Sequence, residues 1–333
     1  MKDDKKYYSD KYFVRAGEIL LADGRDPHVL MQVFCRAKGL LCGVDESLEL
    51  LKSANADLIV HGLSDGDPIG PWETVLTIEG PYAAFAHLET LYLGALARGT
   101  RVATQAQAIV AAANGKPVLF FGARHDHYAT QEADGYAALV AGASGVATDA
   151  QGSRKSLPGI GTVPHALIAA YAGDTVLASK KFVEFMPSEI PFIALVDFDN
   201  DCVNTSLAVA DALGDRLSGV RLDTSSNLID ASLQGDPSAQ TGVNPSLVQN
   251  VRNALDRNGF GQVEIVVSGG LTAERVRAFE EAGAAVDAYG VGSSILRNTG
   301  EFDFTADIVR VDGEPISKVG RELQPNDRLK LIP

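Results

Sequence analysis

The segment FFGARHDHYATQ, residues 120–131, gathers side chains that could do chemistry at the end of an apolar run. Val118–Phe121 is apolar, Gly122 permits a turn, and Arg124 and His125 then supply a guanidinium and an imidazole. An arginine binds carboxylates and phosphates, and a histidine can move protons or bind a metal near neutral pH. The cluster therefore predicts an anion-binding or acid–base site at the end of a buried strand.

Five further short apolar runs end in polar or glycine elements in the same way. These elements are Thr148 with Asp149, Asp197 with Asp199, Arg221 with Asp223, Ser268 with Gly269 and Gly270, and Gly290 with Gly292 and Ser293. In a β/α barrel the active site is built from the loops that follow the strands. The regular placement predicts that all six loops form one site.

Two of these loops are glycine-serine turns, Ser268-Gly269-Gly270 and Gly290–Ser294. Glycine lets backbone N–H groups approach a ligand closely, and helix N-termini favour anions. Barrels often bind phosphate in the loops after their last strands. The pair predicts a phosphate site, and the alternative is a pair of ordinary strand-to-helix turns that need positive φ.

Asp197, Asp199 and Asp223 would bring carboxylates to the same face. Such a group suits Mg²⁺, sugar hydroxyls or a developing positive charge, and the alternative is that each aspartate caps a helix. Arg221, two residues before Asp223, would point to the same side of its strand and could pair with that carboxylate or hold phosphate.

His165 follows a Gly-Ile-Gly-Thr turn and starts a predicted helix. It could cap that helix, or it could act in the site with the other strand ends. A zinc site from His125, His127 and His165 is conceivable, although the spacing typical of zinc ligands is missing.

The elements that position these residues alternate between apolar strands and alanine-rich helices, which predicts a parallel sheet with helices around it. Six strands favour a closed or nearly closed β/α barrel, and no G-x-G-x-x-G follows the first strand to support a Rossmann sheet. The predicted strands are 118–122, 145–148, 193–197, 219–222, 263–267 and 286–289. The predicted helices are 131–143, 165–172, 204–213, 245–258 and 272–282.

The flanking segments differ from this pattern. We expect a helix over 27–36, a β-rich part that includes 74–78, and a long helix over 82–113. Asp312-Gly313 between two apolar runs predicts a hairpin over 307–319, and the C-terminal tail is expected to add strands to the N-terminal domain.

The 333 residues carry a formal charge of -14, with 46 % hydrophobic and 22 % charged residues. The acidic balance argues against a general nucleic-acid or acidic-membrane binder. Three cysteines without metal-ligand spacing suit reduced thiols. With no apolar signal core and no run that could span a bilayer, a soluble cytoplasmic protein is expected.

The motifs FFGAR, GVATDAQG, GTVPHALI, VRLDT, VSGGL and VDAYGVGSSIL, in this order, resemble the nicotinate phosphoribosyltransferase family, specifically its short bacterial and archaeal members. The resemblance runs from SDKYF near residue 9 to EPISKVGR. It implies an α/β sandwich from both chain ends and an incomplete β/α barrel between them. The implied domains are 1–112, 113–297 and a C-terminal return over 298–333.

The resemblance also implies roles. Phe121 and a partner subunit's Tyr12 would stack on nicotinate, while Arg124 faces its carboxylate or the ribose phosphate. Arg221 and Asp223 would contact ribose and phosphate, and the glycine turns would hold the 5′-phosphate. His165 matches a histidine that ATP phosphorylates in many members. A homo-oligomer, a dimer or a trimer of dimers with shared sites, is implied.

The implied reaction joins nicotinate to phosphoribosyl pyrophosphate (PRPP) with Mg²⁺, in NAD salvage. Two departures leave the base open: His125 replaces a second arginine, and Asp149 stands where related nicotinamide enzymes have an aspartate. The stretch SRKSLPG, residues 153–159, is similar to a quinolinate phosphoribosyltransferase signature. Nicotinamide, quinolinate and a catalytically silent pyridine- or nucleotide-binding paralogue therefore remain alternatives.

Overall fold

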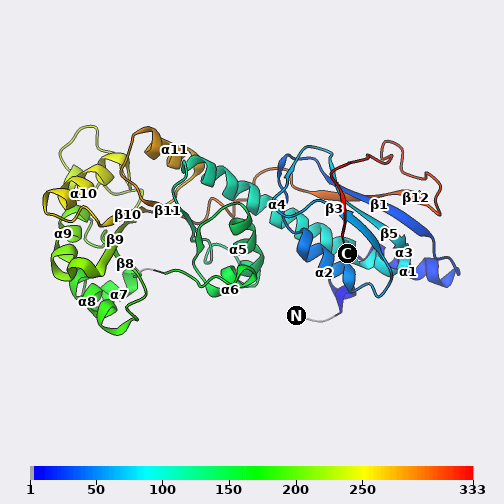
Figure 1. Ribbon diagram of the computed structural model, residues 1–333, viewed down its shortest axis with the longest axis horizontal. Helices are drawn as coiled ribbons and strands as arrows, with labels where there is room; N and C mark the ends of the chain where they lie inside the picture. The colour runs from blue at the N-terminus through cyan, green and yellow to red at the C-terminus, as the bar shows by residue number, and fades with distance from the viewer. Residues whose placement is uncertain (1–3, 162, 333) are drawn as a thin grey trace. The chain divides into compact units, whose positions relative to one another are not determined.

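The computed structural model describes residues 4–161 and 163–332. The chain divides into two compact units, one from Met1–Ala106 with Asn298–Pro333 and the other from Gln107–Arg297. Figure 1 colours the chain from one end to the other and shows both chain ends within the first unit. Among the described residues, no helix combines the length and apolar character needed to cross a membrane.

The first unit is built around a five-stranded antiparallel sheet in the order β12-β1-β5-β3-β13. The strands of this sheet are β1 (His28–Cys35), β3 (Ile59–Gly62), β5 (Thr74–Pro81), β12 (Phe304–Val311) and β13 (Lys330–Ile332), and a short ladder joins β2 (Gly39–Leu40) to β4 (Pro68–Ile69). The helices are α1 (Lys11–Ala22), α2 (Val44–Lys52), α3 (Tyr82–Phe85) and α4 (Glu89–Ala112). The sheet shares one apolar core with α2, α3 and α4, and this core includes Met31, Ile78 and Tyr92.

The helix expected over 27–36 is wrong, because this segment is strand β1. β1 lies between β5 and β12, and from Met31 onward nearly every residue is buried. A strand covered on both faces loses the polar–apolar alternation that marks strands in a sequence. Met, Leu and Gln in the segment are also good helix formers, so local pattern and propensity both pointed away from the strand.

The expected return of the C-terminal tail is confirmed, because β12 pairs with β1 and β13 pairs with β3. Asp312 and Gly313 both have positive φ and form the predicted turn after β12. The hairpin's second strand over 315–319 is wrong; the chain has no strand there and next pairs at β13.

The second unit contains a six-stranded parallel sheet in the order β7-β6-β11-β10-β9-β8. Its strands are β6 (Val118–Phe120), β7 (Gly145–Val146), β8 (Phe192–Leu195), β9 (Leu217–Leu222), β10 (Glu264–Val267) and β11 (Ala288–Val291). Its helices are α5 (Gln131–Val140), α6 (Asp149–Gly152), α7 (His165–Ala170), α8 (Thr175–Phe185), α9 (Cys202–Leu213), α10 (Pro245–Arg257) and α11 (Ala273–Glu281). All six predicted strands are present, and α6 and α8 were not predicted.

The sheet curves as a barrel does but does not close. β7 and β8 are its edge strands, and no described residues pair them. Helices α8, α9 and α10 lie on the outer side of the curve (Figure 1). The predicted incomplete β/α barrel beside a sandwich from both chain ends is confirmed, and the carboxyl ends of the barrel strands meet at one face.

Candidate active site

A cavity of about 530 Å³ lies at the carboxyl ends of the barrel strands. Its polar and glycine lining includes Arg124, His125, His165, Arg221, Asp223, Ser268, Gly269, Gly270, Gly290, Gly292 and Ser293, and its apolar lining includes Phe121, Ile160, Val163, Pro164 and Leu271. Loops after different strands thus converge on one cavity, all from the second unit. Twelve of the residues predicted from the sequence are among the lining residues.

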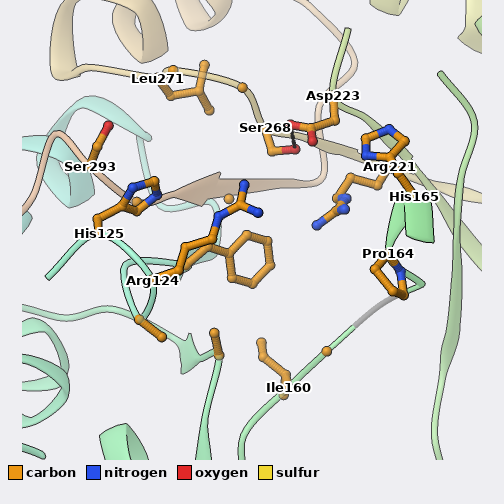
Figure 2. A pocket seen from close by; sticks show the side chains of 18 of the residues that line it. Arg124, His125, Ile160, Pro164, His165, Arg221, Asp223, Ser268, Leu271 and Ser293 are labelled. Atoms are coloured by element: carbon orange, nitrogen blue, oxygen red, sulfur yellow. Dashed lines mark hydrogen bonds between the residues drawn. The ribbon is translucent and has the colours of Figure 1, made fainter. Parts of the chain in front are cut away.

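Arg124 and Arg221 extend into the cavity (Figure 2), and Phe121 is also among its lining residues. The Phe121 N–H donates to Val291 O at 2.8 Å, which fixes this residue just beyond the end of β6. The Arg221 guanidinium lies 5.8 Å from the centroid of the Phe121 ring, within the range of a cation–π contact. Arg124 follows two residues after the Gly122 turn and extends into the same space.

The surroundings of the Arg221 guanidinium favour binding of an anionic ligand. Burial lowers the pKa of its guanidinium, and Asp223 and Asp197 oppose that effect. Its Nε is buried and has no hydrogen-bond partner among the described residues. A buried, underpaired cation gains most from a ligand that restores its lost hydrogen bonds.

Gly290 and Gly292 on β11 and just beyond it make room for aromatic rings. A Cβ at Gly290 would lie 2.6 Å from Cε2 of Phe121, and a Cβ at Gly292 would lie 2.7 Å from Nε2 of His125. Neither glycine has positive φ. Both positions therefore exclude a side chain because the two rings pack against the β11 backbone.

Gly269 and Gly270 are glycine for a different reason. Their φ angles are 94° and 62°, in the left-handed region that other residues rarely adopt. Beside them, the Ser268 hydroxyl donates to Asp223 Oδ1 at 2.8 Å (Figure 2), which joins the loops after β9 and β10. The turn thus presents backbone groups, a hydroxyl and a carboxylate to one side of the cavity.

His165 forms a pair with Asp197 at the start of α7. Its Nε2 lies 3.1 Å from both carboxylate oxygens of Asp197. Burial raises the pKa of the Asp197 carboxyl, while the His165 imidazole acts in the opposite direction. The carboxylate orients the ring and leaves Nδ1 as the nitrogen that does not face Asp197.

His125 lies beside Ser293 and packs on Gly292, at the end of the cavity formed by the β11 turn (Figure 2). Burial, and secondarily the Arg124 guanidinium, lowers the pKa of its imidazole. Both effects favour the neutral imidazole, and the ring packs against Gly292.

Four predicted residues are not among the residues that line the cavity, and one of them is Asp197, the partner of His165. Tyr12 is on α1 of the first unit, where it is 62 % exposed. Asp149 starts α6, and its Oδ1 accepts the Gly159 N–H at 2.8 Å. Asp199 is exposed in the turn after β8.

A protein metal site requires several ligand side chains close together. Within 4–161 and 163–332, no group of three or more His, Cys, Asp and Glu side chains is placed to hold a metal ion. His127 instead accepts the Ala129 N–H through Nδ1 at 3.2 Å. The described residues therefore offer no such group for the zinc alternative from His125, His127 and His165, and Mg²⁺ binding stays a prediction.

Two residues that the sequence did not predict form hydrogen bonds to the loops that line the cavity. Gln131 donates from Nε2 to Ala123 O at 3.3 Å, and its Oε1 accepts the Thr148 hydroxyl at 2.9 Å. Arg275 on α11 donates to carbonyl oxygens of Gly269 and Gly270. The sequence holds one weak signal for the role of these two residues. Each is a polar residue in the first turn of a helix that follows a motif loop.

The fold and the cavity together define a β/α-barrel protein with a polar cavity at the carboxyl ends of its strands. Residues 10–100 match the quinolinate phosphoribosyl transferase N-terminal domain, and residues 102–307 match the C-terminal domain. The chain belongs to the quinolinate phosphoribosyl transferase family.

Similar proteins agree with this family. The solved structure of a nicotinate-nucleotide pyrophosphorylase from Pyrococcus furiosus is 35 % identical, with a TM-score of 0.84 over 100 % of this chain and 85 % of that one. The human nicotinic acid phosphoribosyltransferase structure has a TM-score of 0.70 at 18 % identity, over 93 % of this chain and 76 % of that one, and supports the fold alone.

Two curated relatives are named nicotinate phosphoribosyltransferase. Nicotinate phosphoribosyltransferase pncB1 of Mycobacterium tuberculosis is 31 % identical over 266 residues, which are 78 % of this chain and 55 % of that protein. The Bacillus subtilis nicotinate phosphoribosyltransferase is 27 % identical over 71 % of this chain and 45 % of its own length. The chain thus spans about half the length of the curated relatives it matches.

Proposed function

We propose that this protein is a nicotinate phosphoribosyltransferase, which converts nicotinate and PRPP to nicotinate mononucleotide and pyrophosphate. The observation that carries the proposal is one cavity that combines an aromatic ring, two arginines and two glycine turns. The relatives named nicotinate phosphoribosyltransferase, at 27 to 31 % identity, support the same activity.

The pyridine base would stack on Phe121, with its carboxylate facing Arg124. An aromatic ring binds a flat heterocycle at little entropic cost, and a guanidinium pairs with a carboxylate in a planar, bidentate geometry. Tyr12 would complete the stack from a second copy of the chain, since its exposed ring lies outside the cavity lining.

The 5′-phosphate of PRPP would lie against the Gly269-Gly270 turn and Ser293. Arg221 would contact the phosphates, and Asp223, fixed by the Ser268 hydroxyl, would accept a ribose hydroxyl. Mg²⁺ would enter as the PRPP complex, because Mg²⁺ typically binds to one or two carboxylates plus substrate phosphates.

The bond changes need no strong base. The C1′–O bond to pyrophosphate breaks and its electron pair leaves with pyrophosphate, while the pyridine nitrogen lone pair forms the C1′–N bond. The sugar ring becomes positively charged in between, so the nearby Asp223 carboxylate and the positioning of both reactants would lower the barrier.

His165 would couple ATP hydrolysis to this synthesis. With Nε2 facing Asp197, the lone pair on Nδ1 would attack the γ-phosphorus of ATP, and the bond to ADP would break. The Asp197 carboxylate would stabilise the charge that develops on the ring.

Contacts of the described residues support the proposal of nicotinate over its alternatives. Quinolinate carries a second carboxylate, yet the cations of the SRK stretch are engaged elsewhere. Arg154 pairs with Glu132 at 3.0 Å, and the Lys155 ammonium lies 5.1 Å from the Tyr136 ring centroid. Nicotinamide would need an acceptor for its amide, and the Asp149 carboxylate accepts Gly159 N–H outside the cavity lining.

One assay tests the proposal. Purified protein with PRPP and Mg²⁺ would receive nicotinate, nicotinamide or quinolinate in turn, and pyrophosphate release and the nucleotide product would be measured. We expect the highest kcat/KM with nicotinate. Preference for quinolinate, with release of CO₂, or for nicotinamide would reject the assigned base. PRPP binding without turnover of any base would indicate a silent paralogue.

A further inference from the structure

Arg275 binds the backbone of the Ser268-Gly269-Gly270 turn. It is the third residue of α11, and its guanidinium reaches three backbone carbonyls. Nη1 donates to Gly269 O at 2.8 Å and to Gly270 O at 3.1 Å, while Nη2 donates to Val243 O at 2.9 Å. The planar guanidinium suits this arrangement, because several donors act from one rigid group.

Fixing these carbonyls also fixes the N–H groups of the same peptide units. In a planar trans peptide the C=O and N–H point in opposite directions. The Gly269 carbonyl belongs to the peptide of the Gly270 N–H, and the Gly270 carbonyl belongs to that of the Leu271 N–H. With both carbonyls directed at Arg275, both N–H groups are directed away from it.

These two N–H groups are available to a ligand. Neither the Gly270 N–H nor the Leu271 N–H donates to any residue within 4–161 and 163–332. Both residues line the cavity. Successive N–H groups in a turn with left-handed residues form a concave anion site, and a hydrogen bond to each carbonyl strengthens the N–H donor of the same peptide.

We propose that Arg275 is a positioning residue for phosphate binding, which orients the Gly270 and Leu271 N–H groups toward the 5′-phosphate of PRPP. It acts through the turn and does not itself line the cavity. The inference rests on the proposed function only for the identity of the phosphate ester.

The test compares Arg275→Gln and Arg275→Lys with a matched control on α10. The Arg252 guanidinium likewise donates to two backbone carbonyls, Val263 O at 2.7 Å and Phe260 O at 3.0 Å, and Arg252 is not among the cavity-lining residues. Arg252→Gln therefore removes carbonyl contacts of the same kind elsewhere in the same unit, together with the Arg252–Asp256 ion pair at 2.7 Å. Each variant would be assayed for thermal unfolding, ribose 5-phosphate affinity by calorimetry, and KM for each substrate.

We expect Arg275→Gln to weaken ribose 5-phosphate binding and raise KM for PRPP by about 10- to 100-fold, with KM for nicotinate within about twofold. Arg275→Lys should recover only part of this loss, because an ammonium cannot hold three carbonyls in one plane. Arg252→Gln should lower Tm by a similar amount without changing ribose 5-phosphate affinity.

Unchanged ribose 5-phosphate affinity in both Arg275 variants would overturn the proposal, as would an equal loss in Arg252→Gln. Absence of binding by the unmodified protein would also overturn it. Ribose 5-phosphate binding does not depend on turnover. A protein that binds this ester through Arg275 but converts no base would reject the proposed function and leave the role of Arg275 standing.

Discussion

Gly290→Ala is the substitution that most directly tests the placement of Phe121. The new Cβ would lie 2.6 Å from Cε2 and 2.7 Å from Cδ2 of the Phe121 ring, and 3.3 Å from Cβ of Ser268. Carbon atoms in contact normally lie about 3.5–4.0 Å apart, so the ring or β11 must shift by roughly 1 Å. Overpacking of this kind costs about 1–3 kcal/mol.

The shift should affect activity more than folding, because the Phe121 ring borders an open cavity and can move into it. A displacement of about 1 Å in a substrate-positioning group can lower the rate about 100-fold. We therefore expect kcat/KM for nicotinate to fall by about 10- to 100-fold, or about 1.4–2.7 kcal/mol in transition-state stabilisation, while Tm falls by a few degrees at most.

The assay is a double-mutant cycle with Phe121→Leu, read as kcat/KM for nicotinate. Leucine has no Cε atom to meet the new methyl group, and its Cδ methyl groups can turn away by a change of rotamer. Gly290→Ala should therefore lower kcat/KM less than threefold in that background. Gly94→Ala serves as the control for a glycine replacement. A Cβ there meets nothing within 4 Å, and the helix should gain up to about 1 kcal/mol. If Gly290→Ala keeps kcat/KM within twofold, or loses equally in both backgrounds, Phe121 is not the platform for the base.

Three further predictions address charge. Arg124→Gln should raise KM for nicotinate by about 10- to 100-fold through loss of a charged hydrogen bond, and an equal rise in KM for PRPP would contradict a contact to the base. Labelled γ-phosphate from ATP should appear on His165 and fall severalfold in Asp197→Asn; an unlabelled wild-type protein removes the coupling role. Burial, followed by nearby carboxylates, raises the pKa of Glu89 in the first unit to about 8 from its ordinary 4.5, so the native state favours the protonated form. Its contribution to stability is complete below pH 4.5 and is lost as pH rises to about 8. In urea unfolding, the free energy of unfolding of Glu89→Gln should therefore match that of wild type near pH 4.5 and exceed it by about 2 kcal/mol above pH 8. The full pKa shift would give roughly 5 kcal/mol, at 1.36 kcal/mol per pKa unit. We expect less because a helix N-terminus favours the charged form. A stability difference that does not vary with pH would refute this.

The barrel could be predicted from sequence because its signal is repeated six times. Each strand is buried on both faces and reads as a short apolar run, and each is followed by a polar loop. Interpreting a short apolar run as a buried strand failed for β1. This strand is also buried, but it lies outside the alternation of strands and helices that identifies a parallel sheet. An apolar run of eight residues is ambiguous unless its neighbours in the chain indicate the sheet to which it belongs.

Most of the predicted cavity lining comes from residues that follow the end of a strand, and His165 at the start of α7 is an exception. Phe121, Arg221 and Asp223 follow directly from strand ends. Asp149 lies next to such an end, yet α6 starts there and turns its carboxylate to the Gly159 N–H. Arg275 acts on carbonyls of loops after β9 and β10, and no spacing rule predicts which carbonyls a helix side chain will reach.

The two glycine turns show why a shared motif type need not mean a shared function. A Cβ at Gly270 would find no atom closer than 3.6 Å, so this residue is restricted by its left-handed φ and by the direction of its peptide. Gly290 has ordinary φ and is restricted by the ring beside it. Substitution at the first turn should therefore act on phosphate affinity, while substitution at the second should act on the base. Both turns were predicted as parts of one phosphate site, which stays a prediction, and the packing of Phe121 and His125 places aromatic rings against the β11 turn as well.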